Sequence, residues 1–303
     1  MKKALILSLA LVIGLVGCKK LPTVDSIEMS RSSIFLLKDG SMQLSAACKP
    51  QDANIGLNWS SSDTGVARVS MDGVVTAVAE GRAEIMVSSS RNPAVSCKCN
   101  VVVSDPKGIQ LWKDGPHWAT YNVGAYAPED FGLRFEWGNP NAYYRNAHDT
   151  GWTSNDVDSL SFIKDEYEKT FAATIKADLT GDNIIYDPAH VHWGGSWRMP
   201  ARTDFMNLWK ECDWEWTYEY KGQYTGYVVK GKGEFGGQSI FLPAAGVGKR
   251  NKLVNAEDAG YYWTSTYFAD EPTHACELLF YDDGIYPGGH LNRSFGFPVR
   301  AVY

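Results

Sequence analysis

The stretch VARVSMDGVVTAV, residues 66–78, decides the fold of the first part of the chain. Each half alternates apolar and polar residues with a period of two, as a strand with one buried face does. Asp72 and Gly73 lie between the halves, and glycine accepts the positive φ that a tight hairpin turn requires. The stretch therefore predicts a β-hairpin.

Similar short alternating runs, separated by turn residues, extend from Ile27 to Val103 and predict a small antiparallel sandwich. Strand alternation places Cys48 on an inward face, and Cys97 and Cys99 on the inward face of the last strand. A disulfide Cys48–Cys97 or Cys48–Cys99 is one interpretation. Three buried thiols that pack as small apolar residues are the other.

Four segments carry a family resemblance: WSSSD (59–63), VARVS (66–70), GVVTAVAEG (73–81) and AEI (83–85). Together they resemble the bacterial Ig-like domain of group 2, which we place at residues 26–104. The resemblance implies an all-β Ig-like sandwich. It also implies a spacer or adhesive module of surface proteins without catalytic residues, and we interpret it as a spacer.

Composition changes abruptly after Asp105. All 16 Tyr, all 6 His and 10 of the 11 Trp residues follow it, whereas the preceding part contains only Trp59. The string Ser104-Asp105-Pro106-Lys107-Gly108 at the change is prone to turn. We therefore expect a second domain at residues 105–303.

Blocks rich in Trp, Gly and Pro recur through this second part: WATYNVGA (118–125), FEWG (135–138), WGGSWRMP (193–200), IFLPAAG (240–246), GYYWTST (260–266) and GFPVRAV (296–302). They resemble the Fibrobacter major paralogous domain family, apart from an unmatched insertion at residues 143–187. The resemblance implies an α+β, C-type-lectin-like fold, which is shared with formylglycine-generating enzymes.

One helix and one hairpin are also expected here. Phe205, Leu208, Trp209 and Cys212 form a single apolar stripe at helical spacing. Because the proline of WGGSWRMP is followed by Ala201 rather than a capping residue, we expect this helix to begin nearer Thr203. Near the end of the chain, Asp283-Gly284 predicts a hairpin turn.

The stretch between the blocks at Trp263 and Phe297 combines rings with carboxylates and amides, which suits stacking on a sugar or a protein hot spot. Relatives of this fold place their variable ligand face in the corresponding stretch. The candidate ligand-binding residues are Tyr267, Phe268, Asp270, Glu271, His274, Tyr281, Asp282, Asp283, Tyr286, His290 and Asn292.

Metal and cofactor sites are not predicted. Glu271-Pro272-Thr273 only partly matches the calcium-binding loop of sugar-binding lectins, and the Trp-Asn-Asp strand of those lectins does not occur. Too few oxygens are present for a calcium ion. His190 and His192 would share a strand face and could hold zinc, but no third ligand lies nearby in the sequence. We interpret them as partly buried histidines.

Catalysis is the weaker alternative. An oxidase like the formylglycine-generating enzymes needs two active-site cysteines, and only Cys212 and Cys276 are available in the second domain. Both lie on apolar periodic faces, which favours core packing or a disulfide Cys212–Cys276 over reactive thiolates. A structural, pilus-like subunit is a further alternative to a binding protein.

The beginning of the chain resembles a lipoprotein leader. Lys2 and Lys3 precede an apolar run, which ends in Leu15-Val16-Gly17-Cys18. The resemblance implies acylation of Cys18, a signal peptide at residues 1–18 and a tether at 19–25. It also implies an outer-membrane lipoprotein on the periplasmic or cell-surface face, because Lys19 is not the usual retention residue. A net charge of -6 without a basic stripe argues against nucleic acid as a partner.

Overall fold

The computed structural model describes residues 23–51, 56–140, 143–144, 174–249 and 252–303. Cys18 and the first part of the predicted tether lie outside these residues, as does most of the expected insertion. Within the described ranges, no helix combines the length and the apolar character that crossing a lipid bilayer requires.

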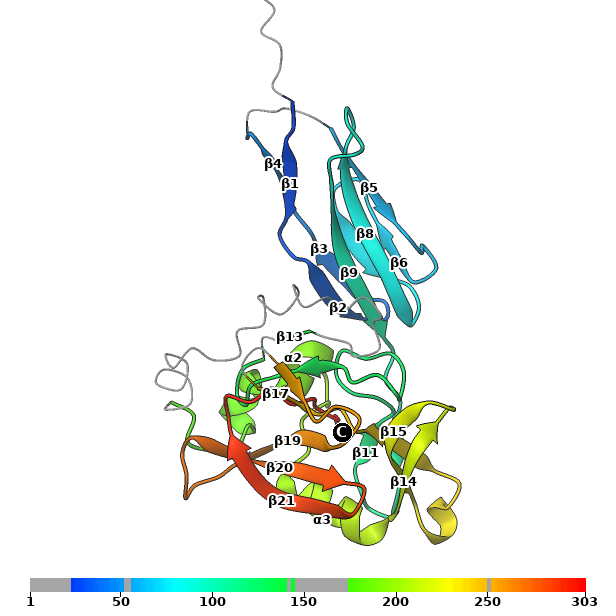
Figure 1. The fold of residues 1–303 in the computed structure, drawn as a ribbon, viewed down its shortest axis with the longest axis vertical. Helices are drawn as coiled ribbons and strands as arrows, with labels where there is room; N and C mark the ends of the chain where they lie inside the picture. Colours follow the sequence, from blue (N-terminus) through cyan, green and yellow to red (C-terminus); the bar gives the residue numbers. More distant parts are fainter. Residues whose placement is uncertain (1–22, 52–55, 141–142, 145–173, 250–251) are drawn as a thin grey trace, which may run out of the picture.

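The first part of the chain is an all-β sandwich (Figure 1). Its strands are β1 (Ser26–Met29), β2 (Ser33–Leu37), β3 (Ser41–Gln43), β4 (Ala46–Lys49), β5 (Leu57–Ser61), β6 (Ala67–Val69), β7 (Val74–Ala77), β8 (Gly81–Ser89) and β9 (Ser96–Ser104). One sheet has the order β2-β9-β8-β5, with β2 parallel to β9. A second sheet has the order β3-β7-β6, and β1 pairs with β4.

The predicted hairpin is formed by β6 and β7, which pair in antiparallel register. Gly73 has φ 81° in the turn, and a Cβ there would lie 2.6 Å from the Leu44 carbonyl oxygen. Glycine is therefore required both by the backbone conformation and by the close approach. Leu44 belongs to the sandwich core, which also contains Val75, Ile85 and Val101.

The cysteines of the sandwich are free thiols in the structure, as in the interpretation without a disulfide at Cys48. Cys48 lies on β4, whereas Cys97 and Cys99 lie on β9, and Figure 1 shows β1 between these strands. Cys48 and Cys97 both pack against the small buried cluster of Val24, Ile27 and Val87. Cys99 is instead a core residue, and burial raises the pKa of its thiol to about 11.

The second part of the chain is mostly β structure with a few short helices, so the α+β description is matched only in part. Its elements are β10 (Gly108–Gln110), β11 (His117–Ala119), β12 (Leu133–Arg134), β13 (Tyr143–Tyr144), η2 (Gly181–Tyr186), α2 (Pro188–Trp193), α3 (Arg202–Glu211), β14 (Asp213–Tyr220), β15 (Tyr224–Lys230), η3 (Gly233–Phe235), β16 (Ser239–Pro243), β17 (Val247–Lys249), β18 (Lys252–Val254), β19 (Gly260–Tyr267), β20 (His274–Tyr281) and β21 (Gly284–Asn292). The longer strands form two sheets, β14-β15-β16 and β19-β20-β21.

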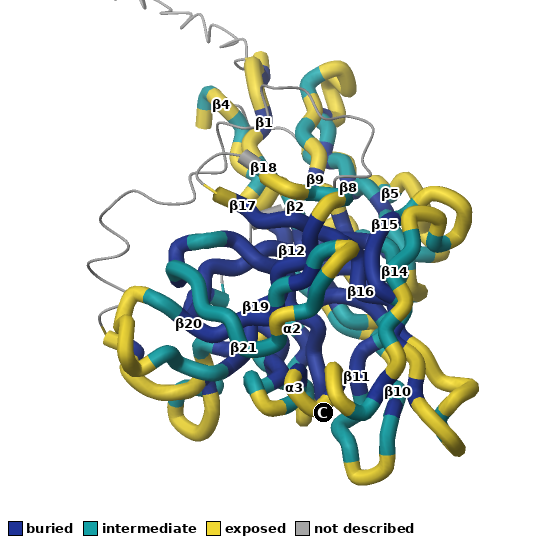
Figure 2. Tube along the Cα trace, turned by 60° about the horizontal axis from the view of Figure 1, so that its bottom comes forward, coloured by how far each residue is buried: buried dark blue, intermediate teal, exposed yellow. Residues whose placement is uncertain are grey.

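Segments at the end of the chain pair with segments at the start of the second part. His117 and Tyr303 exchange backbone hydrogen bonds of 2.9 and 3.0 Å, and Phe135 forms a bridge with Phe297. Figure 2 shows that buried backbone is concentrated around β12, β16 and β19, with the exposed residues in the outer loops and strand ends. The core of this part therefore depends on pairing between segments that are far apart in the sequence.

A fully buried arginine lies within this core. Arg300 donates from Nε to Asn122 Oδ1 at 2.8 Å, from Nη1 to the Ala119 carbonyl at 3.2 Å and from Nη2 to the Phe241 carbonyl at 2.9 Å. Burial lowers the pKa of Arg300 to about 10, so the guanidinium is still charged at neutral pH. Its donors satisfy oxygens from two separate segments, residues 119–122 and β16.

The expected apolar stripe on α3 is partly wrong. Phe205, Leu208 and Cys212 are buried, but 51% of Trp209 is exposed. Trp209 lies about 100° around the helix from Leu208, at the edge of the stripe, where it leaves the core. The helix also begins at Arg202 rather than near Thr203.

Asp204 accounts for this early start of α3. Its carboxylate accepts a hydrogen bond of 2.8 Å from the backbone N–H of Ala201. The alanine side chain has no acceptor of its own, so only this half of a capping box is present.

The two parts of the chain are in contact beside the segment that joins them. Asp105 N donates to Tyr121 Oη at 2.6 Å, and the Arg82 guanidinium lies 5.1 Å from the centre of the Tyr126 ring. Phe35 and Leu37 of β2 pack against the core of the second part.

We expect Arg300→Met to destabilise the protein by about 3–5 kcal/mol, because three buried oxygens would lose their donors. Urea unfolding followed by tryptophan fluorescence measures this. Arg198→Met, which removes a half-exposed ion pair with Asp204, is the control and should cost about 1 kcal/mol or less. An equally small effect at Arg300 would contradict the prediction.

Stability should also depend on Glu136, since burial raises the pKa of its carboxyl from 4.5 to about 7. The folded state holds this proton more tightly than the unfolded chain does. The protonated carboxyl therefore contributes to the free energy of unfolding below pH 4.5, and this contribution is lost as the pH rises through 7. Glu136→Gln should remove that loss, which we expect to be roughly 2 kcal/mol. Urea unfolding of both proteins between pH 4.5 and 8 tests this, and parallel stability curves would contradict it.

Candidate functional site

The predicted ligand-binding residues lie along β20, β21 and the loop before β20, but they do not form one patch. His274 begins β20 and Tyr281 ends it, and seven residue steps in a strand span about 24 Å. The candidates therefore divide between the two ends of a hairpin. We call Tyr218, Tyr281, Asp282, Asp283 and Tyr286 the turn patch, and Phe268, Asp270, Glu271, His274 and His290 the loop cluster.

The turn patch presents two exposed rings beside two exposed carboxylates. Tyr286 is 53% exposed and Tyr218 is 60% exposed. The Tyr218 hydroxyl donates to Asp282 Oδ2 at 2.8 Å, and this hydrogen bond raises the pKa of Tyr218. Asp282 and Asp283 form the two-residue loop, one residue earlier than the predicted Asp283-Gly284 turn.

Tyr218 is absent from the sequence-based candidates because it lies on β14, 64 residues before Asp282. The alternation of rings at Trp214, Trp216 and Tyr218 predicts that they share one face of a strand. It does not reveal that this strand lies beside the β20–β21 turn.

Aromatic rings of neighbouring residues pack against the rings of the turn patch. Trp216 makes edge contacts with Tyr218 and Phe280 at ring-centre distances of 5.8 and 6.2 Å. The Tyr281 hydroxyl lies 3.3 Å from that of Tyr261, and this contact is the main cause that raises the pKa of Tyr281 to about 12. Tyr281 is thus held in place, whereas Tyr286 projects into solvent.

Two of the predicted ligand-binding residues have structural roles instead. The Tyr267 ring packs against the core, and the Arg293 guanidinium lies 4.7 Å from the centre of that ring. Asn292 Oδ1 accepts hydrogen bonds from the backbone N–H and the hydroxyl of Ser294, at 3.0 and 2.6 Å. Both side chains are therefore engaged within the domain.

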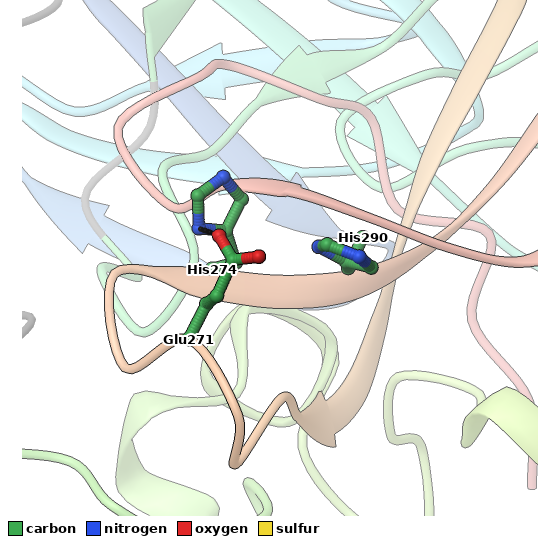
Figure 3. Close-up of side chains that lie close together, drawn as sticks. All are labelled: Glu271, His274 and His290. Atoms are coloured by element: carbon green, nitrogen blue, oxygen red, sulfur yellow. Dashed lines mark ion pairs between the residues drawn. The ribbon is translucent and has the colours of Figure 1, made fainter.

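The loop cluster brings a carboxylate and two imidazoles together (Figure 3). Glu271 Oε2 lies 3.0 Å from His274 Nδ1. The rings of His274 and His290 are 5.4 Å apart at 82°, and the His290 ring stacks on Phe268 at 3.8 Å and 8°. One ligand atom from each of Glu271, His274 and His290 lies within 4.8 Å of the others. Asp270 is exposed in the same loop.

The other histidine pair lies elsewhere and has a different geometry. His190 and His192 are on α2, not on a strand. Two helical steps rotate the side chain by about 200°, so the two histidines lie on nearly opposite sides of the helix and do not share an ion. His192 Nε2 lies 2.9 Å from the Pro140 carbonyl, and burial lowers the pKa of His192. His192 and Val191 line a cavity of about 610 Å³ between α2 and β2.

Cys212 and Cys276 are separate buried thiols, and the disulfide between them is not formed. Cys276 lies on β20, whereas Cys212 is the C-cap residue of α3. Burial raises the pKa of Cys276, and it raises that of Cys212 to about 12, so neither thiol is activated.

The comparisons with known proteins match a family model in the first part of the chain. No curated protein is significantly similar to this chain. Among solved structures, domains 4 and 5 of the surface-layer protein SbsC are 24% identical over 27% of this chain, with a TM-score of 0.23. The match covers 53% of that structure, so this chain spans about half its length.

Intimin structures also match. The intimin–Tir90 complex is 16% identical over 30% of this chain and 55% of that chain, with a TM-score of 0.23. An intimin mutant from EHEC O157:H7 is 11% identical over 89% of this chain and 94% of its own, also with a TM-score of 0.23. The family "Bacterial Ig-like domain (group 2)" matches residues 23–99. Residues 23–99 of this chain are therefore a bacterial Ig-like domain of group 2.

Proposed function

We propose that this chain is a lipid-anchored bacterial surface protein whose Ig-like domain holds a recognition domain away from the membrane. The recognition surface is the turn patch, and its ligand is a glycan or a protein. The observation that carries the proposal is the pair of exposed rings, Tyr218 and Tyr286, beside the carboxylates of Asp282 and Asp283.

Rings of this kind are suited to recognition. A tyrosine offers a large flat surface with few rotatable bonds, so it loses little conformational entropy when a ligand stacks on it. Adjacent carboxylates accept hydrogen bonds from sugar hydroxyls or pair with basic side chains. Because Trp216 and Phe280 pack beneath the patch, the patch is preorganised for binding.

The arrangement of the chain is consistent with a spacer. The first described residues and the second part of the chain lie at opposite ends of the sandwich (Figure 1). Strands β8 and β9 each contain nine residues, which corresponds to roughly 30 Å. An acyl chain on Cys18 would thus be separated from the turn patch by the length of an Ig-like domain.

An oxidase of the formylglycine-generating kind is disfavoured by the burial of its candidate cysteines. Such chemistry needs accessible, reactive thiols, but Cys212 and Cys276 are both buried, and burial raises the pKa of each thiol. The binding function accounts better for the exposed tyrosines.

Replacement of the exposed rings tests the recognition surface. The purified full chain is first screened against glycan and protein arrays, and Tyr218→Ala and Tyr286→Ala are then compared for the ligand found. Each variant should weaken binding by about 1–3 kcal/mol, while its stability changes by about 0.5 kcal/mol or less.

Met71→Ala is the matched control, because Met71 is 92% exposed on the Ig-like domain and should not affect binding. If both tyrosine variants bind as well as the wild type, the turn patch is not the recognition surface.

The anchor is tested separately. Cys18→Ser removes the thiol that would receive the acyl group, so the protein should lose a metabolically incorporated fatty-acid label and move from the membrane to the soluble fraction. Fractionation and label detection measure both effects, with Cys212→Ser as the control that should keep its label. A labelled Cys18→Ser protein would show that Cys18 is not the anchor.

A further inference from the structure

The loop cluster has the composition of a metal site. Glu271, His274 and His290 each offer one ligand atom, and these atoms lie within 4.8 Å of one another. All three residues were expected to contact a ligand directly, and no metal was expected. We propose that they bind a divalent transition-metal ion of the zinc class.

Local structure brings Glu271 to His274. The backbone N–H of His274 donates to the Glu271 carbonyl at 2.8 Å, which closes a four-residue turn with Pro272 at its second position. Proline is favoured there because its fixed φ suits the turn. The turn places a carboxylate oxygen 3.0 Å from His274 Nδ1. Arg293 supports it from the adjacent strand end, because its backbone N–H donates to the Thr273 carbonyl and its Nε to the His274 carbonyl.

Strand pairing brings His290 to the same place. His274 pairs with Asn292 and Cys276 pairs with His290, so the two histidines are diagonal neighbours on one face of the β20–β21 hairpin. Phe268 stacks on the His290 ring and restricts its rotation. Figure 3 shows the His290 ring facing the Glu271–His274 pair from the adjacent strand.

One nitrogen of this cluster lacks a partner in the structure. Nδ1 of His290 is buried and has no hydrogen-bond partner. A buried polar atom without a partner is unfavourable by about 1–3 kcal/mol, so native proteins rarely leave one unsatisfied. An ion coordinated by this nitrogen would satisfy it.

The donor set selects the class of metal. Imidazole nitrogens with one carboxylate oxygen suit zinc and its neighbours, whereas calcium requires six to eight oxygen ligands. Three protein ligands leave a fourth tetrahedral position for water or for a ligand atom. The side chain of His274 is 24% exposed and that of Glu271 is 53% exposed, so an ion can enter from solvent.

Binding requires a small closure of the cluster. Ligand atoms around a tetrahedral zinc ion lie about 3.3 Å apart, given metal–nitrogen distances of about 2.0–2.1 Å. The Glu271–His274 distance of 3.0 Å is already in this range. Rotation of the exposed Glu271 side chain and the partly exposed His274 side chain toward His290 would complete the geometry.

The test is a titration of the purified, chelator-treated full chain with Zn²⁺, followed by competition with a chromophoric chelator. Wild type should bind one equivalent at this site, and Glu271→Gln and His290→Ala should each lower its affinity by roughly 100-fold, the upper end of the loss caused by removing an outer-shell partner. His190→Ala on α2 is the control and should bind as wild type does. Ca²⁺ at the same concentrations should not compete.

All variants keep the five cysteines of the described chain, so any zinc held by thiols is unchanged among them. Glu271 lies in an exposed turn, so Glu271→Gln does not threaten folding, and thermal melts without metal verify this for each variant. Co²⁺ bound by the wild type should give the visible absorption of a tetrahedral site, which Glu271→Gln should lose. Unchanged zinc affinity in both variants, or no binding by the wild type, overturns the proposal.

The loop cluster and the turn patch lie at opposite ends of the hairpin, so failure of one proposal leaves the other intact. Glu271→Gln should leave binding at the turn patch unchanged, and Tyr286→Ala should leave zinc binding unchanged.

Discussion

The second part of the chain depends on the buried guanidinium of Arg300. A charge in an apolar interior is unfavourable unless its hydrogen bonds are complete, and here the donors reach Asn122, Ala119 and Phe241. Ala119 ends β11, Asn122 follows three residues later and Phe241 belongs to β16, whereas Arg300 lies near the end of the chain. The same group therefore closes the domain and fixes the position of the sheets that carry the turn patch and the loop cluster.

The Ig-like domain was predictable because its determinants are local. Alternation and the glycine at position 73 specify strands and a turn within a few residues, and residues 23–99 match the expected family. The lectin-like resemblance of the second part stays a prediction. What the sequence could not show there is the placement of distant segments, such as β14 beside the β20–β21 turn, which brings Tyr218 to Asp282.

The candidate site was predicted as one continuous stretch of the chain, but the residues of that stretch do not form one surface. Tyr281 and His274 were grouped together because they are close in sequence, although an extended strand separates them by about 24 Å. Counting back from the turn at Asp282 and Asp283 would place His290 opposite Ala275, on the other face of the hairpin from His274. A register shift between Glu277 and Leu279 instead pairs His290 with Cys276 and so brings the two histidines to one face, which the sequence alone could not show.

The parallel pairing of β2 with β9 has a mechanical consequence. The chain enters the sandwich through β1 and β2 and leaves it through β9, all running in the same direction (Figure 1). Under the proposed function, tension between the membrane anchor and a captured ligand would pull β2 and β9 in opposite directions along their length. Their evenly spaced hydrogen bonds would then bear the load together, in shear, rather than break one after another as a peeled hairpin does.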